Sequence, residues 1–191
     1  MNKDLYAYNE FIYHDKETEF QGPPSYKCIS KNRLSKNIMP GFFNGNKILF
    51  IGQNPGQPSV TDIHQNEIMS FDEHEIDYFK GFLKCKIGIY LKTVLTQLGF
   101  TVFDVGFTNV VKYSTINNMQ PTIDEASAMI PILKKQIELL KPEKIVAIGA
   151  FASDKLCTNM IQHIRIAHPA SHRYSFFNIA KDVKIINHGG S

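Results

Sequence analysis

The feature that most constrains the fold is a short apolar run that ends in a glycine-rich turn. Residues 48–51 are Ile-Leu-Phe-Ile, and Gly-Gln-Asn-Pro-Gly follows directly at residues 52–56. A β-branched and aromatic run of this length, closed by glycine, is typical of a buried strand in a parallel sheet. Ligand sites of open α/β sheets lie outside the carboxyl ends of such strands. We therefore expect the polar side chains of Gln53 and Asn54 to face a site.

Two further strand-like runs carry a polar side chain near one end. Residues 105–112 contain Asn109 within an apolar stretch, and residues 163–167 are followed directly by His168. A hydrophobic core has no need of these side chains. Because the carboxyl ends of parallel strands share one edge of the sheet, we expect Asn54, Asn109 and His168 to lie near one another.

The rest of the chain alternates strands with amphipathic helices. Strands are predicted over about residues 47–52, 105–112, 144–149 and 163–167. Helices are predicted over about residues 87–98 and 150–160, and after the capping-box sequences that begin at Ser70 and Thr122. This alternation predicts an α/β fold, a three-layer α/β/α sandwich with a central four-stranded, mostly parallel sheet. We expect one domain over residues 1–191, with residues 1–46 as a turn-rich N-terminal cap of short helices and loops.

Composition excludes several classes of protein. No apolar stretch approaches the roughly 20 residues of a membrane span, and the first residues have no apolar segment typical of a signal peptide. The three cysteines, Cys28, Cys85 and Cys157, are scattered and do not form a disulfide framework. We expect a cytoplasmic, intracellular protein with reduced thiols. The net charge of +3 is mild, so it permits DNA binding without requiring it.

The order and spacing of these motifs resemble the uracil-DNA glycosylase superfamily. Residues 52–56 match its first motif, a strand followed by G-Q-[DN]-P-[YG], and residues 168–170 match its second, H-P-[SA]. The T-N-V-V-K sequence at residues 108–112 and the strand with a Gly-Ala step at residues 144–150 resemble its short bacterial and archaeal branch, which usually carries an iron–sulfur cluster. The resemblance extends from about residue 28 to residue 171 and implies DNA as the partner.

The resemblance implies catalytic roles for two residues, Asn54 and His168. In the superfamily the histidine of the second motif donates a hydrogen bond, as a neutral imidazole, to the pyrimidine O2. Asn54 stands where the classical branch has a water-activating Asp; because an amide is not a base, we expect it to orient the attacking water. Gln53 replaces a Glu that is common in the cluster-bearing branch. Two structural alternatives stay open: Asn54 bonds its own turn, or His168 caps a strand end.

Base recognition is expected from Asn109, Gly56 and one phenylalanine. The Asn109 amide offers a carbonyl and an NH₂, which match N3–H and O4 of uracil but not the edge of cytosine; its structural alternative is a bond to a neighbouring loop. Gly56 stands where the classical branch has a Tyr that excludes the thymine methyl group, so larger bases remain possible substrates. For the aromatic platform of a flipped base we prefer Phe82 to Phe71 and Phe79, although each is also a core candidate.

DNA contact is expected just after the second motif. Ser171, His172 and Arg173 stand where the family inserts a wedge into the duplex. Such wedges are commonly apolar, so contact with phosphate is an equally good interpretation for this polar segment.

The iron–sulfur cluster of the similar branch is not expected. Four cysteines hold it there, the first two as CxxC. Cys28 matches the first of them, but Lys31, Tyr113 and Met129 occupy the other positions. We therefore predict no cofactor and no bound metal.

Together these features predict a monomeric, monofunctional DNA glycosylase that removes uracil, or a related deaminated base, in base excision repair. No lysine is evident as a Schiff-base nucleophile, so lyase activity is not expected. Two alternatives stay open. One is a glycosylase for hypoxanthine, xanthine or mismatched thymine, which Gln53 and Gly56 permit. The other is a DNA-binding relative without catalytic activity.

Overall fold

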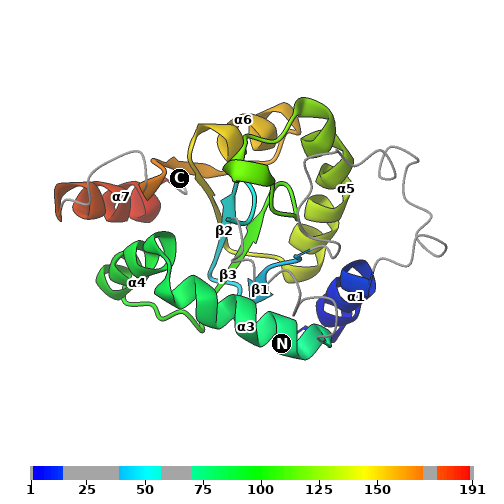
Figure 1. Cartoon of the computed structure of the whole chain (residues 1–191). Coiled ribbons are helices and arrows are strands. Elements are labelled where there is room, and N and C mark those ends of the chain that lie inside the picture. Colours follow the sequence, from blue (N-terminus) through cyan, green and yellow to red (C-terminus); the bar gives the residue numbers. More distant parts are fainter. Residues whose placement is uncertain (1, 15–38, 57–69, 170–175, 190–191) are drawn as a thin grey trace.

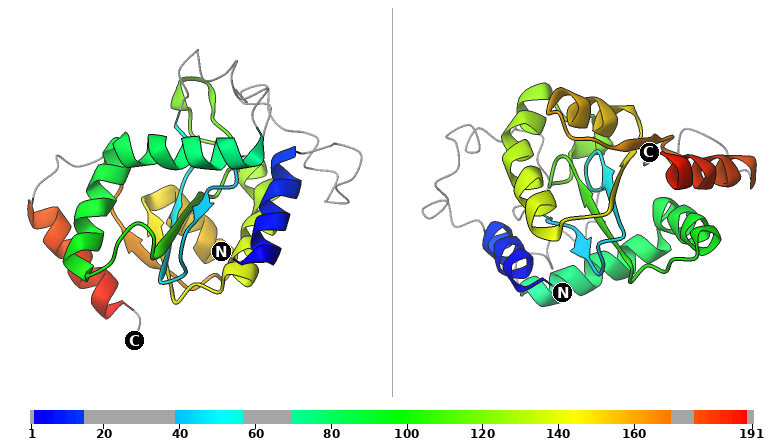
Figure 2. Two further views of the ribbon diagram at one scale, coloured as in Figure 1. Left: turned by 90° about the horizontal axis from the view of Figure 1, so that it is seen from below. Right: turned by 180° about the vertical axis from the view of Figure 1, so that it is seen from behind.

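The computed structural model describes residues 2–14, 39–56, 70–169 and 176–189, and a mixed sheet lies between helices on both faces (Figures 1 and 2). The sheet order is β1-β3-β2-β4-β5, and every neighbouring pair is parallel except β1 with β3. The strands are β1 (Phe42–Phe43), β2 (Ile48–Gly52), β3 (Val105–Asn109), β4 (Lys144–Ile148) and β5 (Ile164–Ile166).

The predicted α/β sandwich is confirmed, but the predicted number of four strands was wrong. The fifth strand, β1, lies in the segment that we predicted as a cap, and it pairs Phe42 with Phe107 of β3. Two residues are too few to show the alternation that identifies a strand in a sequence. Strand β1 therefore forms because it pairs with β3, and the local sequence pattern does not reveal this pairing.

The helices begin largely where the sequence predicts. They are α1 (Lys3–His14), α3 (Phe71–Lys84), α4 (Lys86–Leu98), α5 (Ile123–Leu140), α6 (Ala150–Thr158) and α7 (Phe176–His188), with a 3₁₀ turn η2 (Ile116–Asn118). Both capping boxes form: Ser70 caps α3 with Glu73, and Thr122 caps α5 with Glu125. Helix α7 was not predicted. In the described part of the chain, no helix has the length and apolar content needed to cross a membrane.

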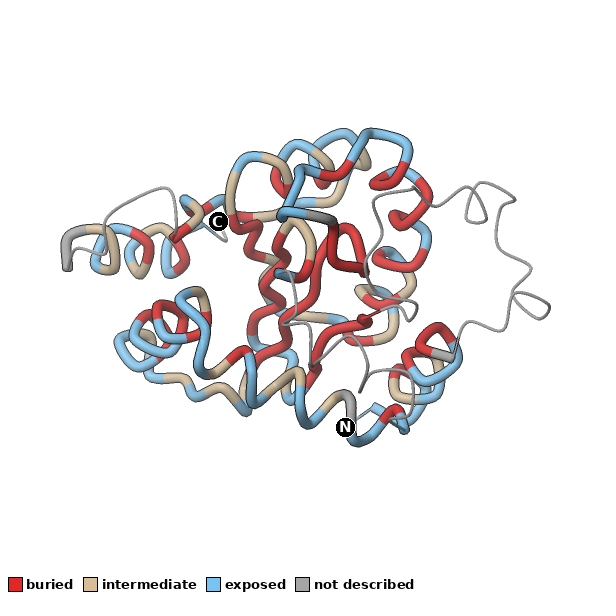
Figure 3. Tube along the Cα trace, viewed as in Figure 1, coloured by how far each residue is buried: buried red, intermediate tan, exposed pale blue. Residues whose placement is uncertain are grey.

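Apolar side chains cover both faces of the sheet. Along β2, Leu49 and Ile51 pack with α1, α5 and α6, whereas Ile48 and Phe50 pack with α4 and the end of α3. The strands accordingly form the buried centre in Figure 3. Burial on both faces explains why the strands appear in the sequence as continuous apolar runs.

A buried polar network lies where α1, β3 and α5 meet. The Nζ of Lys112 donates to Thr108 Oγ1 and to Gln136 Oε1, each at 2.6 Å, and burial holds the pKa of Lys112 well below its usual range. Gln136 Nε2 donates in turn to Asn9 Oδ1 at 2.9 Å and to the Pro40 carbonyl at 3.2 Å. The network ties helix α1, helix α5 and the segment before β1 to the end of β3.

Candidate active site

A cavity of about 980 Å³ opens beside the carboxyl ends of β2, β3 and β4. Its wall includes every residue for which the sequence analysis proposed a catalytic or base-binding role. These residues are Gln53, Asn54, Gly56, Phe82, Asn109 and His168. They come from four separate parts of the chain, which the parallel sheet and helix α3 bring together. The three predicted DNA-contacting residues, Ser171, His172 and Arg173, lie outside the described residues.

Asn109 is held at the end of β3 by a glycine and a tyrosine. In the sheet register Gly52 stands opposite Asn109, and a Cβ atom at position 52 would come within 2.5 Å of Asn109 Oδ1. The absence of a side chain at Gly52 therefore makes room for the amide. Asn109 Nδ2 donates to the hydroxyl of Tyr78 in α3 at 3.1 Å. Burial raises the pKa of Tyr78, so this hydroxyl stays protonated across the physiological range.

Asn54 lies in the turn after β2 and is half-buried. Its Nδ2 donates to the Pro55 carbonyl and to Thr115 Oγ1, each at 3.2 Å, while its Oδ1 accepts a hydrogen bond from Gln53 Nε2 at 3.2 Å. The bond to Pro55 is the local turn contact that the sequence left open. The bond to Thr115 adds a second anchor from a distant part of the chain, so the amide is held from two sides.

His168 is half-buried, and burial lowers its pKa, which keeps its imidazole neutral at neutral pH. Gly149 lies against it: a Cβ at this position would stand 3.2 Å from His168 Cβ, and Gly149 adopts a φ of +87° that favours glycine. The Gly149 N–H also donates to the Ile166 carbonyl at 2.9 Å. Helix α6 begins directly afterwards, so its positive dipole end and the neutral imidazole lie at the same cavity.

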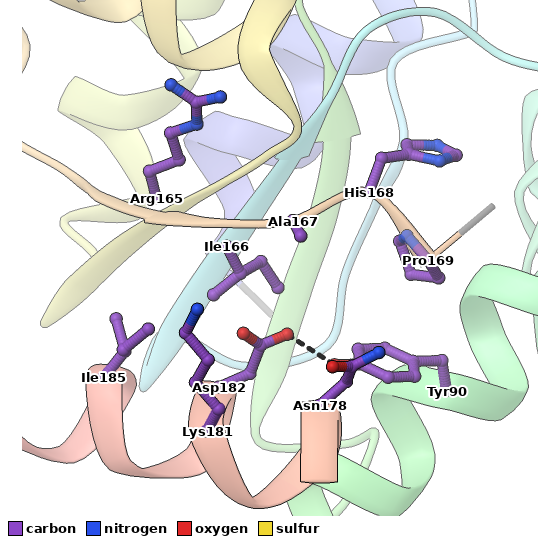
Figure 4. A pocket seen from close by; sticks show the side chains of 10 residues that line it. All are labelled: Tyr90, Arg165, Ile166, Ala167, His168, Pro169, Asn178, Lys181, Asp182 and Ile185. Atoms are coloured by element: carbon purple, nitrogen blue, oxygen red, sulfur yellow. Dashed lines mark hydrogen bonds between the residues drawn. The ribbon is translucent and has the colours of Figure 1, made fainter. Parts of the chain in front are cut away.

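A second, smaller pocket of about 320 Å³ lies on the other side of the segment that carries His168. It lies between β5, α4 and α7, and the Tyr90 hydroxyl donates to the buried Asp182 carboxylate there. Figure 4 shows the His168 ring directed away from Asp182 and Lys181. His168 borders both pockets, and its ring points away from these polar groups of the smaller one. The hydrogen bond from Tyr90 to Asp182 joins α4 to α7.

The three phenylalanines considered for a base platform occupy different positions. Phe82 is 8% exposed and lines the cavity, with its ring centroid 4.8 Å from that of Phe42 and 4.6 Å from that of Phe107. Phe71 packs against tyrosines of α1, and Phe79 packs against Phe42. Neither Phe71 nor Phe79 is among the residues that line the cavity. Of the three, only Phe82 combines a place in the core with a place on the cavity wall.

Two residues that hold the cavity amides were missed by sequence reasoning. Tyr78 precedes Phe82 by four residues in α3, so helical spacing does put it on the face of the predicted platform. Thr115 gives no comparable indication. It lies beside Asn54 because the chain after β3 continues next to the turn after β2: the Val111 N–H donates to the Gln53 carbonyl at 2.9 Å, and Ser114 Oγ donates to the Gly56 carbonyl at 2.7 Å.

The side chains at the positions of the family's cluster ligands do not fit an iron–sulfur cluster. Tyr113 and Met129 are fully buried in the apolar core that includes α1 and α5. Cys85 and Cys157 are exposed and lie at the start of α4 and in α6. Within the described ranges no three His, Cys, Asp or Glu side chains come together in a way that could hold a metal ion. Cys28 and Lys31 lie outside those ranges.

Comparisons with known proteins find a matching family and several relatives. A family model described as the uracil DNA glycosylase superfamily matches residues 40–186. A type-4 uracil-DNA glycosylase of Saccharolobus solfataricus is 30% identical over 129 residues, which is 67% of this chain and 52% of that protein. One from Thermotoga maritima is 32% identical over 117 residues, 61% of this chain and 52% of the relative. One from Pyrobaculum aerophilum is 41% identical over 69 residues, 36% and 35% of the two chains. The chain thus spans about half the length, or less, of the curated relatives it matches.

Proposed function

The chain belongs to the uracil DNA glycosylase superfamily, and on that basis we propose that it is a monofunctional glycosylase that hydrolyses the N-glycosidic bond of uracil, or of a related deaminated base, in DNA. The observation that carries the proposal is the convergence of Asn54, Asn109 and His168 on one cavity. Two amides and a neutral imidazole supply the groups that orient water, bind a base edge and stabilise a departing base. The type-4 uracil-DNA glycosylases among its relatives support the same substrate.

The reaction breaks the bond between C1′ of the sugar and the ring nitrogen of the base. The oxygen of water bonds to C1′, the electron pair of the broken bond leaves with the base, and the proton released by water ends on the base or in solvent. Negative charge therefore develops on the base. In our proposal His168 donates a hydrogen bond to the pyrimidine O2, where this charge collects. A donor fixed in advance is worth about 3 kcal/mol in such a site.

Asn109 is proposed to recognise the base through its Watson–Crick edge. Its carbonyl oxygen would accept from N3–H and its NH₂ would donate to O4, while the Phe82 ring stacks on the flipped base. Gln53 completes the polar wall beside Asn54. The low exposure of Asn109, 2%, supports recognition, because a hydrogen bond in a site without water discriminates strongly between bases.

DNA is proposed as the partner of a monomeric protein. Lys80 and Lys84 of α3 are exposed at the cavity, where they can meet phosphates beside a flipped nucleotide. Ser171, His172 and Arg173 remain proposed contacts, as a wedge or through phosphate.

We propose that the reaction runs without an iron–sulfur cluster, because tyrosine and methionine replace the thiolates at two ligand positions. Purified protein should be colourless and free of iron. Stoichiometric iron with absorbance at about 400 nm would contradict this.

The open space at Gly56 supports a second candidate substrate class. A Cβ at this exposed position would meet no atom of the described residues within 4 Å. A base with a 5-methyl group, or a deaminated purine, would therefore find no wall here among the described residues. Hypoxanthine, xanthine and thymine opposite guanine belong in any test beside uracil.

A panel of labelled oligonucleotides tests the proposal. Duplex and single-stranded DNA carrying U·G, U·A, hypoxanthine, xanthine or T·G is incubated with the protein, and alkali then cleaves any abasic site. We expect cleavage at uracil, and His168→Ala should lower the rate about 100-fold. His163→Ala is the matched control, since His163 is half-buried, bonds Ser153 and the Ile161 carbonyl, and does not line the cavity. Cleavage at no base by folded protein would refute the proposal in favour of a binding protein without activity.

A further inference from the structure

The side-chain amide of Asn54 has a defined polarity. Its Nδ2 faces two acceptors, the Pro55 carbonyl and Thr115 Oγ1, while its Oδ1 faces a donor, the Gln53 NH₂. An amide turned by half a rotation would put its oxygen against the Pro55 carbonyl, which cannot donate. One side of the Asn54 amide is therefore reserved for its NH₂.

Thr115 adds to this restraint because its single proton is already engaged. The Thr115 hydroxyl is 1% exposed and donates to the Met119 carbonyl at 2.6 Å. A hydroxyl has one proton, so towards Asn54 the Thr115 oxygen is an acceptor. Hydrogen bonds therefore run in one direction, from the Asn54 NH₂ to Thr115 and from Thr115 to Met119.

The turn that follows Thr115 keeps the Met119 carbonyl in place. Asn117 and Asn118 adopt φ values of 53° and 52°, a left-handed conformation that asparagine tolerates better than most residues. The Asn118 N–H bonds the Thr115 carbonyl at 3.1 Å and closes the turn. Thr115 itself is not among the residues that line the cavity, so it acts only through its neighbours.

We infer that Thr115 is a positioning residue that fixes Asn54 with its carbonyl oxygen as the acceptor for the attacking water. The inference rests on the proposed function and assigns a residue to the hydrolytic step. An amide cannot remove a proton from water, so its useful contribution is to accept a hydrogen bond and aim the water oxygen at C1′. An amide in the opposite orientation would donate to the water and occupy the lone pair that must attack.

The experiment compares Thr115→Val, which keeps the shape and removes the hydroxyl, with Thr115→Ser, which keeps the hydroxyl. We expect Thr115→Val to lower the single-turnover cleavage rate about tenfold, the cost of one hydrogen bond that acts in the transition state, and to leave the Kd for uracil-containing DNA unchanged. Thr115→Ser should restore most of the rate. Ser153→Ala is the matched control, because it removes a buried hydroxyl that bonds His163 and does not line the cavity.

A double-mutant cycle separates positioning from a structural role. In the Asn54→Ala background, Thr115→Val should cause no further loss of rate, because the side chain that it positions is gone. If Thr115→Val lowers the rate of Asn54→Ala as much as it lowers the rate of the parent, the inference is overturned. A Thr115→Val rate equal to that of the parent would also overturn it, as would a Thr115→Ser rate as low as that of Thr115→Val. If Thr115→Val does not fold, the test is the solvent exchange rate of the Asn54 side-chain amide protons, measured by NMR in the parent protein. Rapid exchange of both protons contradicts the hydrogen bond to Thr115. A parent that cleaves no base refutes the proposed function as well, whereas an active parent that is insensitive to Thr115 refutes only this inference.

Discussion

Asn54 and Asn109, the two cavity asparagines with proposed roles in the reaction, are held in different ways. Asn54 lies in a turn and is fixed by partners of defined polarity, namely the Pro55 carbonyl, Thr115 and Gln53. Asn109 lies on a strand, and its described hydrogen bond runs to the hydroxyl of Tyr78. A phenolic hydroxyl can donate or accept, so this contact holds the Asn109 amide in place but is compatible with either orientation of its two ends.

This difference corresponds to two tasks. A group that aims water has to present an acceptor before any substrate arrives, so its orientation must be built into the protein. A group that binds a base can take its final orientation from the base itself. The strand and the space at Gly52 fix where Asn109 lies, and the base edge then selects which end of the amide meets which atom. We therefore expect changes around Asn54 to affect the rate, and changes around Asn109 to affect the choice and binding of the base.

The largest effect is expected from Asn54→Ala. Without the amide the water loses its acceptor, and we expect the single-turnover rate at uracil to fall about 100-fold while the Kd for DNA stays unchanged. Asn109→Ala removes the amide proposed to bind the base, and this variant should mainly lose discrimination between uracil and cytosine. Equal loss of rate and equal loss of discrimination in both variants would remove the distinction between the two residues.

A tenfold effect is expected when the space for Asn109 is filled. Gly52→Ala puts a methyl group within 2.5 Å of Asn109 Oδ1, so the amide has to move. We expect kcat/KM for uracil to fall about tenfold, because a displaced binding group loses most of one hydrogen bond. Gly81→Ala adds the same methyl group on the same cavity, at an exposed position of α3 where it would meet no atom of the described residues within 4 Å, and is the matched control. A Gly52→Ala variant as active as Gly81→Ala would show that Asn109 does not need its present position.

Some of these contacts could be predicted from the sequence, and others could not. The strands that carry Gly52 and Asn109 were predictable, because burial on both faces makes such strands uniformly apolar and a polar residue at their ends then stands out. Their convergence was predictable too, since parallel strands bring their carboxyl ends to one edge. The contact between Thr115 and Asn54 was not, because it depends on how the irregular segments that follow β2 and β3 continue side by side beyond the strands. Strand β1 and helix α7 were not predicted for a similar reason, because packing against distant segments stabilises them.

A smaller effect, about threefold, is expected from Tyr78→Phe. The change removes the hydroxyl that bonds Asn109 Nδ2 and keeps the ring, so the amide loses one net hydrogen bond of modest strength. We expect KM for uracil-containing DNA to rise and kcat to stay close to that of the parent. Tyr8→Phe, on helix α1 and away from the cavity, is the control for loss of a partly buried hydroxyl. A fall in kcat with unchanged KM would mean that Tyr78 serves the chemical step, contrary to the division proposed between the two amides.

The last prediction concerns the network behind Asn109 and expects no change of rate. Lys112 bonds Thr108, the residue before Asn109, and burial holds its pKa well below 10.5. Between the lowered pKa and 10.5 the unfolded chain binds the proton that the folded protein lacks, so the free energy of unfolding should rise with pH. For one proton the slope reaches about 1.4 kcal/mol per pH unit.

Lys112→Met removes this slope, which urea unfolding at several pH values up to about pH 9 measures. At these pH values tyrosines of the unfolded chain, whose ordinary pKa is about 10, stay largely protonated, and burial raises the pKa of Tyr8 in the folded protein. The variant also removes the shorter hydrogen bond to Gln136 Oε1 and leaves only the one from Thr108 Oγ1 at 3.4 Å, at a cost of about 1–3 kcal/mol. If Asn109 is held by its strand, Gly52 and Tyr78, cleavage of uracil at neutral pH should be unchanged. An unaltered slope would contradict the buried, neutral lysine. A lowered rate in a folded variant would show instead that the position of Asn109 depends on the network, and the two asparagines would then both rely on chains of hydrogen bonds behind the cavity wall.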